Sequence, residues 1–227
     1  MLFRDRRDAG RRLADKLGDY ANRDGVVLGL PRGGVPVAFE VARGLGAPLD
    51  VLGVRKLRVP SQPELAMGAI GEDGVRVINH GIVETVGVGE ADLVEVVRRE
   101  RGELERRTTG FRLGRRRVAL RGRVVVVVDD GVATGATARA ACEVARAHGA
   151  LGVVVAVPVG PRSLNADLAG VADEIVCLYS PEPLMGVGRW YQDFAQVSDE
   201  QVVALLDGAA RGGIVDARAD GRRIEGR

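Results

Sequence analysis

Five consecutive valines at positions 124–128 constrain the fold of this 227-residue chain more than any other stretch. A short apolar run of β-branched residues is typical of a strand buried on both faces, as in a parallel sheet. Asp129 and Asp130 follow directly, then small and hydroxyl residues, and an apolar helical pattern begins at Ala136. The stretch therefore predicts a strand, a turn and a helix, with two carboxylates at the sheet edge where ligands usually bind.

The turn after this strand has the composition of a phosphate-binding loop. Gly131 and Gly135 permit tight turns, and the first amides of the helix point outward at the positive end of its dipole. A phosphate monoester can bind there. The two acids would repel it in direct contact, so we expect them to accept hydrogen bonds from a sugar diol or to organise a metal ion. A ribose 5-phosphate satisfies both requirements; the structural alternative is an acidic turn with an ordinary helix cap.

The stretch resembles the 5-phosphoribosyl-1-pyrophosphate (PRPP) binding motif of type I phosphoribosyltransferases: apolar residues, two acids, two variable residues and a Thr-Gly-x-Thr-like ending. The chain is most similar to a bacterial group of predicted phosphoribosyltransferases without an obvious acceptor. The resemblance implies that Asp129 and Asp130 are catalytic, hold the ribose hydroxyls and bind Mg²⁺. It implies that the 5′-phosphate is bound by Gly131, Val132, Ala133, Thr134, Gly135, Ala136 and Thr137.

A second strand–turn–helix unit lies near the N-terminus. An apolar run at 26–30 leads into Pro31, Arg32, Gly33 and Gly34, and a helical pattern follows to Leu45. The turn resembles the pyrophosphate loop of the same family, with Arg32 and the amides of Gly33 and Gly34 as pyrophosphate ligands. A strand predicted at 49–54 ends in Arg55 and Lys56, for which we expect a second pyrophosphate contact. The alternatives are an ordinary turn and a solvated basic pair.

Strands alternate with helices along the chain, which predicts an α/β fold with a doubly wound, mainly parallel sheet flanked by helices. The family adds a small hood and a flexible loop that closes over PRPP. We expect that loop at 57–74, as an irregular excursion followed by a hairpin pairing 66–70 with 75–78; a plain surface loop is an equal alternative. Charged helices are predicted at 6–18 and 90–107.

Residues 179–197 match the place of the hood and contain the only tryptophan. Trp190, Tyr191 and Phe194 suit the binding of a flat acceptor base, and Asp193 is a candidate general base. The alternative is that the rings merely close the core. Ala133 stands where hypoxanthine-guanine enzymes of the family have an aspartate, so a 6-oxopurine acceptor is disfavoured.

Bulk properties set further limits. A net charge of +2 implies no broad nucleic-acid surface, although arginines cluster at 115–123. Cys142 and Cys177 have no metal-ligand spacing, and no apolar run reaches membrane-spanning length, so we expect a cytoplasmic protein. The expected domain covers residues 1–207, and we expect a homodimer. Residues 208–227 are predicted to be a linker or disordered tail, and they end in Ile-Glu-Gly-Arg, which matches a protease-cleavage tag.

The function expected from these features is transfer of a phosphoribosyl group from PRPP to a nitrogenous small-molecule acceptor, with release of pyrophosphate. Two alternatives stay open: a PRPP-sensing regulatory protein that uses its arginine cluster on RNA, and a phosphohydrolase acting on a ribose phosphate. The acceptor cannot be identified from the sequence.

Overall fold

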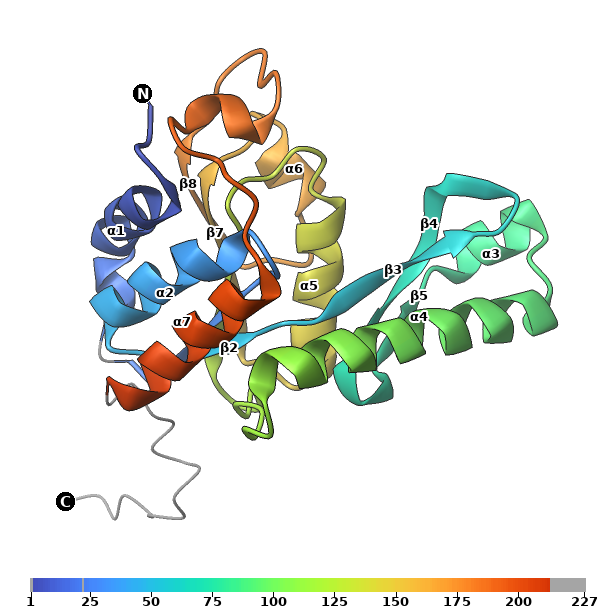
Figure 1. The fold of residues 1–227 in the computed structure, drawn as a ribbon. Helices are drawn as coiled ribbons and strands as arrows, with labels where there is room; N and C mark the ends of the chain where they lie inside the picture. Colours follow the sequence, from blue (N-terminus) through green and yellow to red (C-terminus); the bar gives the residue numbers. More distant parts are fainter. Residues whose placement is uncertain (1, 22, 213–227) are drawn as a thin grey trace.

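The computed structural model describes residues 2–21 and 23–212 (Figure 1). Its centre is a parallel sheet with the strand order β2-β1-β6-β7-β8. The strands are β1 (Gly25–Gly29), β2 (Leu49–Val51), β6 (Val124–Val128), β7 (Gly152–Val159) and β8 (Glu174–Tyr179). The expected doubly wound α/β fold is confirmed, and the valine run is the middle strand.

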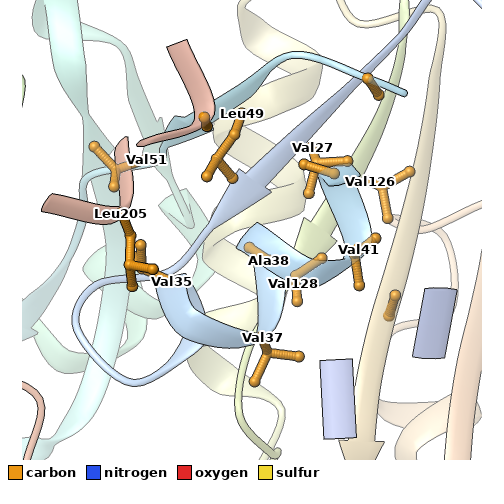
Figure 2. Packing of buried hydrophobic residues seen from close by; sticks show 14 of the residues in the cluster. Val27, Val35, Val37, Ala38, Val41, Leu49, Val51, Val126, Val128 and Leu205 are labelled. Atoms are coloured by element: carbon orange, nitrogen blue, oxygen red, sulfur yellow. The ribbon is translucent and has the colours of Figure 1, made fainter. Parts of the chain in front are cut away.

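Helices cover both faces of this sheet (Figure 1). Helices α1 (Arg6–Lys16), α2 (Gly34–Leu45) and α7 (Asp199–Arg211) lie on one face, and α5 (Ala136–Ala147) lies on the other. Val126 and Val128 pack toward the first face with Val35, Val41 and Leu205, as Figure 2 shows, while Val125 and Val127 pack toward α5. Since successive side chains of a strand point to opposite faces, a run of valines fills two cores at once.

An antiparallel arm projects from this body (Figure 1). It consists of β3 (Val54–Val59), β4 (Gln62–Gly71) and β5 (Arg76–Ile78), with a 3₁₀ turn η2 (Glu72–Gly74) between the last two. Helices α3 (His80–Val86) and α4 (Glu90–Arg112) pack along it around a separate apolar cluster that contains Leu57, Met67, Ile70 and Leu104.

The arm differs in two ways from the sequence-based expectation. The hairpin after residue 66 is present, but residues 57–59 and 62–65 belong to strands β3 and β4 rather than to an irregular excursion. The pairing of β3 with β4 runs from Val54↔Gly71 to Val59↔Gln62, with irregular register around Arg58. The strand predicted at 49–54 ends at Val51, and Val54 begins β3, so Arg55 and Lys56 lie inside β3 and not at the end of a strand. Charged residues interrupt the apolar alternation of β3, which hides this strand in the sequence.

The remaining elements are a short helix α6 (Leu164–Asp167) and two 3₁₀ turns, η1 (Gly18–Tyr20) and η3 (Val187–Trp190). Ser198 forms a capping box with Gln201 at the start of α7, and the helix continues through Arg211. Residues 208–211 are therefore helical rather than part of the expected tail, and residues 213–227 lie outside the described part of the chain. In that described part, every helix is too short or too polar to cross a bilayer.

Candidate functional site

Two turns leave the carboxyl edge of the sheet side by side. Strands β1 and β6 are neighbours in register, with Gly29 opposite Val128, and the chain goes from β1 to α2 on one face and from β6 to α5 on the other. The amide of Leu30 donates to the carbonyl of Val128 at 2.9 Å. This reversal of winding is the switch point at which open α/β sheets bind ligands.

Glycines let the first turn lie directly on the two acids. A Cβ atom at Gly33 would lie 2.1 Å from Oδ2 of Asp130, and a Cβ atom at Gly34 would lie 2.6 Å from the carbonyl oxygen of Val128. No larger residue fits at either position without displacing the acids or the strand end. The structure therefore brings the predicted pyrophosphate turn into contact with the predicted ribose acids.

Asp129 and Asp130 are half-buried at this edge. Oδ1 of Asp129 accepts from the amide of Asp130 at 2.9 Å, and Oδ2 of Asp130 accepts from Nε of Arg6 at 2.8 Å. Burial and the neighbouring Asp130 charge raise the pKa of Asp129 well above its usual range. Burial also raises the pKa of Asp130, and Arg6 opposes that effect.

The loop between β6 and α5 has the backbone of an anion-binding turn. Gly135 is the N-cap of α5 with a φ of 72°, and no side chain of the described residues caps this helix end. The amides of the first turn are thereby left for another acceptor. Ala133, Thr134 and Thr137 are exposed, whereas Val132 is buried and its amide donates to Val159.

The predicted pyrophosphate contacts fall into two places. Arg32 and Arg55 line one cavity of about 130 Å³ together with Arg106 and Arg107 of α4. Lys56 lines a different hollow of about 440 Å³, with Ala136 and Arg139 of α5. Because Arg55 and Lys56 are successive residues of β3, their side chains point to opposite faces. The structure brings Arg55 together with Arg32, but not Lys56.

The hood rings pack against one another and against the acid pair. Tyr191 is buried, its hydroxyl donates to the carbonyl of Asp130 at 2.6 Å, and its ring lies 5.0 Å from that of Phe194. Trp190 packs on Tyr179, and its indole N–H donates to Leu184. Asp193 is exposed and lines a cavity of about 520 Å³ between α1, α2 and α7. The hood is thus beside the acids, with Phe194 and Asp193 as its accessible members.

Arg6 is a site residue that the sequence analysis missed. Its side chain is only 11% exposed and bridges Asp130 to the carbonyl of Ala195, to which Nη1 donates at 2.8 Å. The sequence predicted only a charged helix at 6–18, with no role for its arginines in the site. No signal in the sequence separates Arg6 from Arg7, Arg11 and Arg12, because only the position of α1 against the sheet edge selects it.

The acid pair suits Mg²⁺, the metal that the sequence resemblance implies. Mg²⁺ is usually held by one or two carboxylates together with substrate phosphate oxygens and water. Asp129 and Asp130 provide the carboxylates of that donor set, and the described residues contain no cluster of three or more His, Cys, Asp or Glu side chains that could hold a metal by itself. The residues present therefore fit a magnesium ion bound jointly with its substrate.

The arginine cluster at 115–123 is largely engaged with acids of the same chain. Arg115 pairs with Asp207 at 2.5 Å, Arg117 with Asp73 at 2.6 Å and Arg123 with Asp24 at 2.8 Å. These contacts offer an RNA partner less free cationic surface than the sequence suggests.

Fold and site together define the class of this protein: residues 4–177 match the phosphoribosyl transferase domain family, and the chain belongs to it. Two curated Mycobacterium tuberculosis sequences, Rv0571c and MT0597, are each 58% identical to it over 223 residues and are provisionally named phosphoribosyl transferases. The alignments cover 96% of this chain, which spans about half the length of these curated relatives. The crystal structure of TT1426 from Thermus thermophilus is similar with a TM-score of 0.84 and 46% identity, covering 91% of this chain and 98% of that one.

Proposed function

We propose that this protein transfers the 5-phosphoribosyl group of PRPP to a nitrogenous acceptor and releases pyrophosphate. The observation that carries the proposal is the contact between the turn at Gly33 and the acid pair, at the head of an uncapped helix. An anion site in each of the two turns would flank the two carboxylates, and PRPP has the matching order of 5′-phosphate, ribose diol and pyrophosphate. Membership of the family supports the same assignment.

Each group of residues has a role in this reaction. Residues 131–137 hold the 5′-phosphate and so keep the sugar in place for attack. Asp129 and Asp130 accept hydrogen bonds from the ribose hydroxyls and lie near the cationic character that develops on the sugar. Arg32, the amides of Gly33 and Gly34, and Arg55 stabilise the negative charge on the departing pyrophosphate. Lys56 lies on the α5 side, so any contact from it would be to another part of PRPP.

Mg²⁺, held by Asp129, Asp130 or both, would add neutralisation of the pyrophosphate charge. The acceptor would enter on the side of Phe194, Trp190 and Tyr191, where Phe194 offers the accessible ring, and Asp193 would take its proton. Ala133 has no side chain able to hydrogen-bond an acceptor, which favours acceptors other than 6-oxopurines. We further propose that the protein is a homodimer and acts in the cytoplasm.

The first test is incubation with PRPP, Mg²⁺ and a panel of bases and small amines, with pyrophosphate as the measured product. Acceptor-dependent pyrophosphate release supports a transferase. Inorganic phosphate without an acceptor would point to a phosphohydrolase instead. PRPP binding without turnover would point to a sensor.

Replacing both acids, Asp129→Asn with Asp130→Asn, should abolish pyrophosphate release because the ribose hydroxyls and the metal lose their charged acceptors. Asp15→Asn with Asp19→Asn is the matched control, since it removes two exposed carboxylates from the same chain and should leave turnover unchanged. Undiminished turnover in the Asp129/Asp130 variant would refute the assignment.

A further inference from the structure

One guanidinium group joins the acid pair to the hood. Nε of Arg6 donates to Oδ2 of Asp130 at 2.8 Å, and Nη1 donates to the carbonyl of Ala195 at 2.8 Å. Cζ of the same group lies over the ring of Phe194, 3.9 Å from its centroid. A planar guanidinium can donate in its plane and stack through its face simultaneously, and an ammonium cannot.

The burial of Arg6 sets it apart from its neighbours on α1. Its side chain is 11% exposed, compared with 34% for Arg12 and 42% for Arg11. Arg12 pairs with Asp8 of its own helix and lies over Phe3, away from the acid pair. Among these arginines, Arg6 alone is placed between two parts of the proposed site.

Asp130 has two further contacts besides the one with Arg6. The turn at Gly33 abuts the same Oδ2 atom that Arg6 holds, and Tyr191 donates to the backbone carbonyl of Asp130. The carboxylate of Asp130 is therefore contacted from α1 and from the turn after β1, and its backbone carbonyl is held by the hood. Of these, only the contact with Arg6 neutralises charge and also reaches the segment at Phe194.

We propose that Arg6 is a positioning residue of the PRPP site, which orients Asp130 toward the ribose and ties that orientation to the hood through Phe194 and Ala195. This inference rests on the proposed function. It assigns Arg6 no contact with substrate: the residue acts through Asp130 on one side and through Phe194 on the other. An acceptor that binds at Phe194 then meets a site whose ribose acid is already aligned.

The test measures the dissociation constant of PRPP with Mg²⁺ by calorimetry, which needs no acceptor. Arg6→Lys keeps the positive charge but loses the planar set of N–H donors of the guanidinium group. PRPP binding should therefore weaken about tenfold, equivalent to about 1.4 kcal/mol. Arg6→Ala should weaken it further. Methylguanidinium at low millimolar concentration should restore most of the affinity of Arg6→Ala, because it can fill the vacated place between Asp130 and Phe194, whereas methylammonium should not.

Two comparisons separate positioning from folding. Arg12→Ala removes another arginine of the same helix and should leave PRPP affinity within about twofold of wild type, since its contacts are with Asp8 and Phe3. Phe194→Leu combined with Arg6→Ala forms a double-mutant cycle, in which the two losses of PRPP affinity should not add. Thermal unfolding of each variant reports whether it is folded.

The outcomes are distinct. If the wild-type protein does not bind PRPP, the proposed function and this inference both fall. If it binds PRPP and Arg6→Ala binds equally well or more tightly, only the inference falls. A loss in Arg6→Ala that methylguanidinium does not repair, or that is strictly additive with Phe194→Leu, would likewise reduce Arg6 to a structural residue.

Discussion

Asp130 is contacted by three residues that are far apart in the sequence: Arg6, Gly33 and Tyr191. Each contact depends on a different property: the charged planar guanidinium of Arg6, the absence of a side chain at Gly33 and the buried hydroxyl of Tyr191. The acid pair can be recognised from its place after the valine run. Its partners cannot, because arginines, glycines and tyrosines with other roles occur throughout the chain.

A residue-scale prediction concerns pH and His148. Burial and the nearby Arg117 lower the pKa of His148 below its ordinary value near 6.5, and Asp73 and Glu72 oppose this effect. The unfolded chain therefore takes up the proton first as the pH falls. The contribution of neutral His148 is fully present above about pH 6.5 and is lost as the pH falls through the folded-state pKa.

Urea unfolding followed from about pH 8 to about pH 5.5 should show this loss in the wild-type protein, and His148→Gln should reduce it. The only other histidine, His80, is exposed, so His80→Gln should retain the wild-type pH dependence. Identical pH profiles for wild type and His148→Gln would contradict the prediction.

At the scale of elements, α4 is fastened to the sheet by buried charges. Arg112, near its end, donates through Nε to Asp50 of β2 at 2.8 Å and through both terminal nitrogens to Glu72 of η2. All three residues are buried. Burial by itself would lower the pKa of Arg112, but the hydrogen bonds and charges of Glu72 and Asp50 raise it on balance, so the guanidinium stays charged in the folded protein. The network joins the long helix, a central-sheet strand and the base of the arm.

Removing one partner from this network should destabilise the folded protein. Arg112→Met leaves Asp50 and Glu72 as buried, uncompensated carboxylates, and it should lower the free energy of unfolding by about 3–5 kcal/mol in chemical denaturation. Arg98→Met, which removes an exposed partner of Glu95 on the same helix, should leave stability unchanged. Equal stabilities for the two variants would show that the network is not what holds α4.

The whole molecule should respond to PRPP as one unit, because the site draws residues from α1, the turn after β1, the turn after β6 and the hood. A ligand that binds only the folded state adds about 2.7 kcal/mol at a concentration of about 100 Kd. For a chain of this size, that corresponds to a rise in Tm of roughly 5–10 °C.

Differential scanning fluorimetry with PRPP and Mg²⁺ measures this shift, and the Asp129→Asn, Asp130→Asn variant is the control that should not show it. If PRPP does not change the Tm of the wild-type protein, the assigned PRPP site is contradicted. This test of binding needs no acceptor.

The patterns of apolar residues in the sequence predicted much of the fold. The valine strand, the strand expected at 26–30 and helices α2 and α5 were predicted from runs and periodicities that burial on one or two faces imposes. The arm was predicted only in part. In strand β3, charged residues interrupt the alternation of apolar and polar side chains that marks a strand. Helix α3 has seven residues, none of them buried, so its sequence carries no strong apolar periodicity.

The sequence by itself determined the parallel sheet and the two turns that follow β1 and β6, because backbone turns and buried strands demand particular residues at neighbouring positions. Only the tertiary structure decided that Arg55 lies with Arg32 while Lys56 lies by α5, and that Arg6 rests between Asp130 and Phe194. Those relations depend on strand direction, on which face each helix covers and on how closely two glycines let the chain approach. Contacts between distant segments follow from packing, and packing is a property of the whole chain rather than of any stretch within it.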